Sequence, residues 1–62
     1  NEINLISEEL ITKIKIYDYQ GKLVLEKNND VKFIKVSSLN SGIYFIEVFM
    51  NNYKSLQKVI IE

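Results

Sequence analysis

Residues 39–50, which read LNSGIYFIEVFM, hold the clearest structural signal of the chain. A polar bend leads into the stretch from Gly42 to Met50, which alternates with a period of two as a β-strand does. Glu47 decides which face is outside, because an unpaired carboxylate is costly to bury. The outward face is therefore predicted to carry Ile43, Phe45, Glu47 and Phe49. The buried face is predicted to carry Tyr44, Ile46, Val48 and Met50.

The same period continues along the rest of the chain. Further strands are expected at Ile3–Ile6, Ile11–Tyr17, Leu23–Lys27, Phe33–Val36 and Lys54–Ile61. The polar segments between the strands are expected to be turns, namely Ser7–Glu9, Asp18–Gly21, Asn28–Asp30, Ser37–Ser41 and Asn51–Asn52. Turns spaced by ~8–12 residues are typical of antiparallel sandwiches and barrels. The sequence therefore predicts an all-β fold, a small antiparallel Ig-like β-sandwich.

Alternation also predicts which face of each shorter strand is buried. Ile14 and Ile16 share one face while lysines occupy the other, and Ile34 and Val36 are expected to point inward. In Leu23–Lys27 the period favours Leu23 and Leu25 as the buried side, but Val24 competes, so this register stays open, as does that of Lys54–Ile61. The pair Asn51–Asn52 fits a two-residue hairpin of type I′, because asparagine tolerates the left-handed conformation.

Tyr44 is expected to have a structural role. A leucine, a glycine-containing bend and a tyrosine near the start of a central strand resemble the tyrosine corner of Greek-key sandwiches, in which the hydroxyl bonds to backbone a few residues upstream. A buried phenol needs such a partner. Gly42 would then adopt a backbone angle that a β-carbon disfavours.

Composition limits the classes of function. The chain has 62 residues, eight lysines, no arginine, and eight acidic residues that balance the lysines. A neutral domain has no long-range attraction for nucleic acid or an anionic membrane, and no apolar run is long enough to insert into a bilayer. With no cysteine, stability must come from packing, and a core of this size rarely supplies more than ~3–5 kcal/mol. The chain is expected to be a single domain over residues 1–62, a fragment of a larger protein, because Asn1 is not a natural start.

Enzyme chemistry finds little support in the residues. Cysteine and histidine are both absent, and the two glycines lie too far apart for a phosphate-binding loop. No acid, base or nucleophile has an activating partner, so no catalytic residue and no cofactor is expected. Glu8-Glu9 is expected to be a solvated turn, and Asn28-Asn29-Asp30 offers too few carboxylates for calcium. The residues that a carbohydrate platform would use are the four tyrosines, Tyr17, Tyr19, Tyr44 and Tyr53.

Three motifs in order resemble the C-terminal sorting domain (type A) of proteins exported by the type IX secretion system. The first combines Ile-Tyr-Asp, a Gly-Lys pair and a valine, and is formed by Ile16, Tyr17, Asp18, Gly21, Lys22 and Val24. The second is the stretch Ile34–Tyr44. Its leucine, glycine and tyrosine at the positions typical of the family are Leu39, Gly42 and Tyr44. The third is a lysine followed by aliphatic residues, here Lys58, Val59, Ile60 and Ile61. The match spans about residues 11–62. The family's opening Pro-Asn-Pro element and first strand are missing or lie upstream of Asn1.

The resemblance implies a non-catalytic secretion and sorting signal at the C-terminus of a bacterial cargo protein. It implies passage through the periplasm, recognition by the outer-membrane translocon, and removal by a surface sortase. The final location would be the cell surface or the extracellular space. The alternative is an adhesive or carbohydrate-binding sandwich module of a surface protein. A missing first strand would also leave a sheet edge unpaired, which, with Phe45 and Phe49 facing outward, predicts self-association of the isolated chain.

Overall fold

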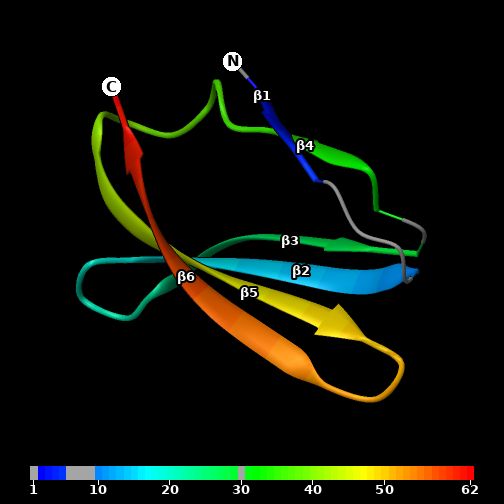
Figure 1. Cartoon of the computed structure of the whole chain (residues 1–62). Helices are drawn as coiled ribbons and strands as arrows, with labels where there is room; N and C mark the ends of the chain where they lie inside the picture. Colours follow the sequence, from blue (N-terminus) through cyan, green and yellow to red (C-terminus); the bar gives the residue numbers. More distant parts are fainter. Residues whose placement is uncertain (1, 6–9, 30) are drawn as a thin grey trace.

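Two antiparallel sheets make up the part of the chain that the computed structural model describes, which is residues 2–5, 10–29 and 31–62. The strands are β1 (Glu2–Asn4), β2 (Ile11–Asp18), β3 (Leu23–Asn28), β4 (Phe33–Lys35), β5 (Gly42–Met50) and β6 (Lys54–Ile61). One sheet has the order β3-β2-β5-β6, and the other pairs β1 with β4 (Figure 1). The predicted all-β antiparallel fold is confirmed. Ile6, Ser7–Glu9 and Asp30 lie outside the described residues.

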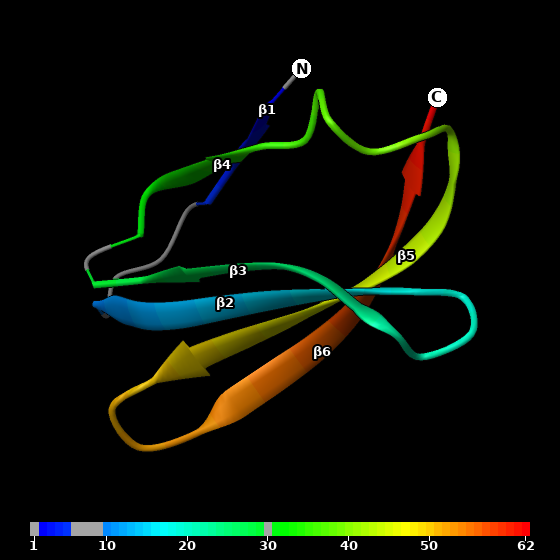
Figure 2. The ribbon, with the colours of Figure 1, turned by 180° about the vertical axis from the view of Figure 1, so that it is seen from behind.

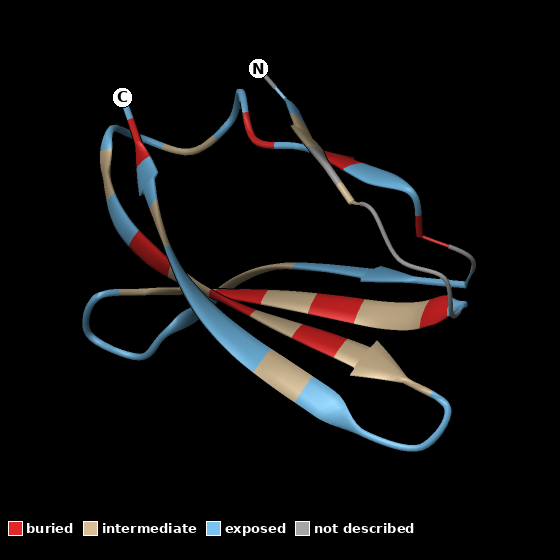
Figure 3. Cartoon of the chain, viewed as in Figure 1, coloured by how far each residue is buried: buried red, intermediate tan, exposed pale blue. Residues whose placement is uncertain are grey.

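The small sheet lies over one face of the larger sheet, with the core between them (Figure 2). Buried positions alternate along β2 and β5 and recur around β4 (Figure 3). Ile14, Ile16 and Ile34 are fully buried and Val36 is buried, so both predictions of an inward face are confirmed. Tyr44, Ile46 and Val48 are also buried. Burying one such aliphatic side chain stabilises a fold by roughly 1.5–3 kcal/mol, so this small set supplies most of the driving force.

A β-bulge explains why alternation could not settle the register of β3. Ile16 lies opposite Leu25, but the next residue, Tyr17, lies opposite Leu23, which leaves Val24 without a partner on β2. An extra residue of this kind bends the strand and changes which side chains share a face. Val24 and Leu25 both pack against the core, whereas Leu23 is 43% exposed on the outer face. The interpretation of Leu23 as a buried residue is therefore wrong.

The hairpin between β5 and β6 differs from its predicted turn type. Its two-residue loop is where the sequence places it, and the amide of Met50 donates to the carbonyl of Tyr53 at 2.9 Å. A type I′ turn needs positive φ at both loop residues, but neither Asn51 nor Asn52 has it. Asparagine tolerates the left-handed region without requiring it. Asn29, which follows β3, has φ 69° instead.

Candidate functional site

The bend before β5 is held by the hydroxyl of Tyr44. That hydroxyl donates to the carbonyl of Asn40, four residues upstream, at 2.7 Å. The amide of Leu39 closes the preceding turn by donating to the carbonyl of Val36, and the Leu39 side chain packs against the core. Gly42 has φ 155°, and an added Cβ would meet the Tyr44 ring at an ordinary contact distance of 3.9 Å. Backbone conformation, and not lack of space, therefore favours glycine here. The predicted tyrosine corner is confirmed.

The turn between β2 and β3 is organised by the carboxylate of Asp18. One of its oxygens, Oδ1, accepts from the amides of Gln20 and Lys22, both at 2.9 Å. The amide of Gly21 donates to the carbonyl of Asp18, and Gly21 has φ 87°. The turn forms because the aspartate accepts two backbone amides and the glycine tolerates a positive φ. The side chain of Lys22 is exposed to solvent.

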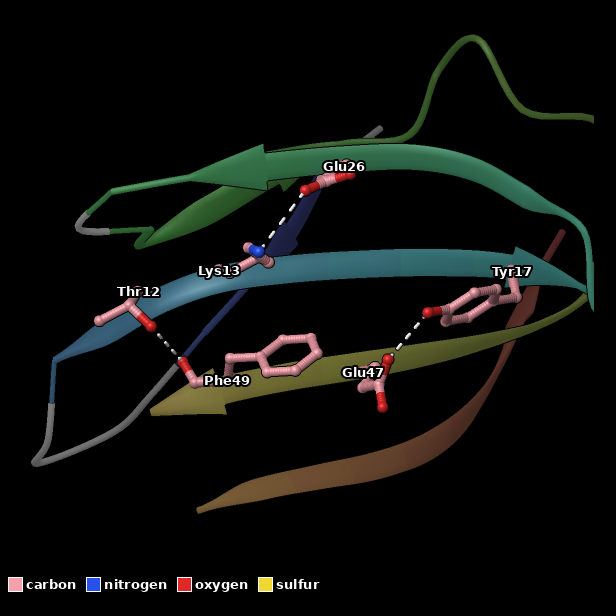
Figure 4. A network of polar contacts seen from close by, with 6 residues as sticks. All are labelled: Thr12, Lys13, Tyr17, Glu26, Glu47 and Phe49. Carbon is pink, nitrogen blue, oxygen red and sulfur yellow. Dashed lines mark hydrogen bonds and ion pairs between the residues drawn. The ribbon is translucent and has the colours of Figure 1, made fainter. Parts of the chain in front are cut away.

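The outer face of the four-stranded sheet carries a polar network around Glu47 (Figure 4). Its carboxylate accepts from the hydroxyl of Tyr17 at 2.8 Å and pairs with the Nζ of Lys54 at 3.1 Å. Tyr17 and Lys54 come from opposite neighbouring strands, each one step diagonal to Glu47. The Tyr17 hydrogen bond, and then Lys54, lower the pKa of the Glu47 carboxyl, and the same hydrogen bond raises the pKa of Tyr17.

Sequence reasoning placed Glu47 on the correct face but missed its partners. It treated the carboxylate as a solvated group, whereas only 16% of its side chain is exposed. The signal that could have revealed the network is the cross-strand register, since diagonal neighbours in an antiparallel sheet are within reach of long side chains. That register depends on knowing which strand pairs with which, and the sequence alone does not give it.

Phe49 forms the centre of a lysine cluster on the same face. The amino groups of Lys13, Lys15 and Lys54 lie 5.6–5.7 Å from the centre of its ring. Lys13 also makes a long ion pair of 3.9 Å with Glu26 on β3. The hydroxyl of Thr12 donates to the carbonyl of Phe49 at 3.2 Å (Figure 4), where the β2–β5 register shifts. Phe49 is therefore half-buried under lysine side chains and not an open apolar surface.

The third motif lies on β6, an edge strand. Val59 and Ile61 lie opposite Tyr44 and Gly42 and face the core, where Ile61 is buried. Lys58 faces outward and lies opposite Phe45 of β5. On its other side, Phe45 lies opposite Tyr17 of β2. The fold thus places Tyr17 of the first motif and Lys58 of the third on either side of one aromatic ring. Val24, Leu39 and Ile61 are elsewhere, packed in the core.

A hollow of about 440 Å³ opens between β1 and the β5–β6 part of the larger sheet. Its apolar walls include Ile3, Leu5, Ile46, Val48 and Val59, and its polar ones Ser55 and Gln57. Among the described residues, Tyr53 is the titratable side chain in its lining, and no carboxylate or lysine lines it. In the described ranges, no three metal-binding side chains gather.

The tyrosines do not gather into a platform for sugars. Tyr44 is buried and bonded to backbone, and Tyr17 is bonded to Glu47. Tyr19 lies in the β2–β3 turn and Tyr53 beside the β5–β6 loop. Because β2 and β5 are antiparallel, these two turns lie at opposite ends of the sheet. Flat stacking of one sugar on several tyrosines therefore has no geometric support.

The whole chain is similar to a described family of protein domains. The family model described as the secretion system C-terminal sorting domain matches residues 1–62, the whole chain. Neither the curated proteins nor the solved structures gave a match. Within residues 2–5, 10–29 and 31–62, no helix has the length and apolar character that crossing a membrane requires.

Proposed function

Because the chain belongs to the family of secretion system C-terminal sorting domains, we propose that it directs a cargo protein through the type IX system to the cell surface. The observation that carries the proposal is the match of the family model over all 62 residues. In this proposal the domain acts by being recognised, and it catalyses no reaction.

The signal, in this proposal, is a folded surface and not a linear peptide. Asp18, Gly21, Gly42 and Tyr44 each satisfy a local requirement of the backbone, and Ile61 packs in the core. These motif residues are therefore used to build the sheet. What a receptor could contact is the set of side chains that the sheet then displays.

The proposed route has three steps. The domain, carried at the C-terminus of its cargo, crosses the periplasm and is recognised by the outer-membrane translocon. A surface sortase then removes it as the cargo is attached to lipopolysaccharide. The neutral net charge supports recognition by shape and local contacts over long-range attraction.

A fusion protein tests the proposal. A secreted reporter with a signal peptide is joined ahead of residues 1–62 and expressed in a bacterium with a type IX system. We expect reporter at the surface of the parent strain and in the periplasm of a translocon-deletion strain. Ile14→Asp, which places a charge at a fully buried position, is the unfolded control and should remain periplasmic. Surface delivery without the translocon, or none with it, would contradict the proposal.

A further inference from the structure

One part of the outer face gathers several exposed apolar side chains on two adjacent strands. On β6, Leu56 and Ile60 are 63% and 64% exposed, and Lys58 lies between them. Their neighbours on β5 are Ile43, which is 43% exposed, and the half-buried Phe45. We call these five residues the β6 patch. Exposed apolar surface gathered in one place marks interaction sites more often than scattered residues do.

Lys58 has no counter-charge in this patch. Glu47 lies diagonally across from both Lys54 and Lys58, but its carboxylate pairs with Lys54. Glu26, which also lies on the outer face, pairs with Lys13. Lys58 makes no ion pair with any residue that the structure describes. The patch therefore presents one uncompensated positive charge surrounded by aliphatic side chains.

The position of β6 makes the patch accessible. In the described sheet β6 pairs with β5 on one side, and its other side is an edge. The side chains of Leu56, Lys58 and Ile60 consequently have strand neighbours on one side alone. A partner can reach them from the face and from the edge, where unpaired backbone groups also favour a protein contact.

The charge of the patch indicates its partner. Burying the aliphatic residues against a partner also removes the Lys58 ammonium from water, which is costly unless a carboxylate meets it. An anionic bilayer is disfavoured, since lipid binding by charge takes a cluster of about 4–8 basic residues and the chain is neutral. A second copy is disfavoured too, because two-fold packing of the patch on itself would bring Lys58 against its own equivalent.

We propose that the β6 patch is the surface through which the export machinery recognises the domain, and that the partner protein offers an apolar surface with a carboxylate opposite Lys58. This inference rests on the proposed function and adds the location and chemistry of the contact. Tyr17, which flanks Phe45 from the other side, links the patch to the first motif. The central contact would then be Phe45 and Lys58, with Leu56 and Ile60 excluding water around them.

The reporter fusion carries the test, with matched variants. Lys58→Glu reverses the charge, and Leu56→Ser and Ile60→Ser each remove one exposed aliphatic residue. We expect Lys58→Glu to lower surface reporter at least about tenfold and Lys58→Gln to lower it less, since a charge facing a carboxylate changes from attraction to repulsion. Denaturant melts of the chain should show all of these variants folded, because exposed positions contribute little to stability.

Two controls make the same chemical changes elsewhere. Lys35→Glu reverses an exposed lysine on β4, and Leu10→Ser removes an aliphatic side chain that is 51% exposed. Both should be exported within about twofold of wild type, as surface changes outside a contact usually are nearly neutral. If the wild-type fusion and all the patch variants reach the surface equally, the inference is overturned while the proposed function stands. If the wild-type fusion itself stays in the periplasm, the proposed function falls.

A binding experiment separates a protein partner from lipid. Fluorescently labelled chain is titrated with the purified translocon in detergent and, separately, with phosphatidylglycerol vesicles. We expect saturable binding to the translocon that Lys58→Glu weakens by about tenfold or more. Binding to vesicles that depends on Lys58, with none to the translocon, would overturn the inference in favour of a membrane contact.

Discussion

The two ends of the larger sheet's outer face contain similar side chains but differ in how these are satisfied. At the Phe49 end, lysines cover an aromatic ring, and Glu26 and Glu47 pair with Lys13 and Lys54. At the Phe45 end, Lys58 makes no ion pair with any described residue, and its aliphatic neighbours are exposed. A self-satisfied end contributes to folding, whereas an unsatisfied end is available for a partner. The difference teaches that exposure and unpaired charge together, and not residue type, separate the two roles.

Removing the end of β6 should have the largest effect. Deleting Lys58–Glu62 takes away the charge of the patch and, in addition, Val59 and Ile61 from the core side. We expect surface delivery of the reporter to be lost, with the protein still made and periplasmic. Fractionation of cells followed by immunoblotting measures this. Unchanged surface delivery would show that export does not require these residues.

Loosening the start of β5 should come next, because this strand carries both Phe45 and Phe49. Tyr44→Phe leaves the carbonyl of Asn40 without the hydroxyl that donates to it. We expect the free energy of unfolding to fall by about 1–3 kcal/mol. Gly42→Val should lose a comparable amount, about 1–3 kcal/mol, through backbone strain at positive φ. Denaturant melts measure both. If both variants melt like wild type, the corner does not fix the strand that the two ends share.

Much of this arrangement could be predicted from the sequence, for physical reasons. Alternation predicted the inner face of β2, since only one of its faces is apolar. In β5 both faces are apolar, and Glu47 identified the outer one. The bend chemistry of Asp18, Gly21, Gly42 and Tyr44 is local, so neighbouring residues were sufficient to predict it. The hairpin position followed for the same reason.

The remaining features depend on contacts between distant segments. The bulge at Val24 arises from pairing with β2, and alternation within β3 carries no trace of it. Lys54 and Lys58 lie on one strand and one face, and sequence does not tell which of them Glu47 will pair with. The predicted apolar patch of Phe45 and Phe49 was accordingly correct in face but too broad, because lysines from two other strands cover Phe49.

Phe49 offers a direct comparison with the patch. Phe49→Ala removes the ring under three lysine side chains. We expect the free energy of unfolding to fall by roughly 1–2 kcal/mol, less than the ~3–5 kcal/mol expected for a fully buried phenylalanine. Ile60→Ser, at the open end, should change stability by less than about 0.5 kcal/mol. Urea melts of the two variants side by side test this. Equal losses would mean that the two ends contribute alike to the fold.

The ion pairs of the Phe49 end should be visible in the pH dependence of stability. The folded-state pKa of Glu47 lies below its ordinary value of 4.5, so the ionised carboxylate favours the folded state. That contribution is complete above about pH 4.5 and is lost as the pH falls through the folded-state pKa. We expect Glu47→Gln to be less stable than wild type near neutral pH and to approach it in acid. Thermal melts from neutral to strongly acidic pH measure the convergence, with Lys58→Gln as the control that should show none.

Tyr17→Phe is the sharper variant of the same experiment. It removes the first cause of the lowered Glu47 pKa but leaves Lys54 in place. We expect its stability to converge with that of wild type over the same acidic window, by a smaller amount than for Glu47→Gln. A pH profile parallel to that of wild type would show that the hydrogen bond does not lower the pKa of Glu47.

Self-association should be the smallest effect, and it concerns the edge of β6 and not its face. Sheet stacking through Phe49 is disfavoured by the lysines that cover it, but the outer edge of β6 can still pair with another copy. Pairing through a single edge strand is weak, so we expect a mass above 7.3 kDa only as the concentration rises. Light scattering over a concentration series measures it, and a constant mass near 7.3 kDa contradicts it. Edge pairing leaves Lys58 and its neighbours uncovered, so Lys58→Gln should not change the association. A dimer formed through the patch would bring the two Lys58 side chains together, so the same variant would make that dimer tighter.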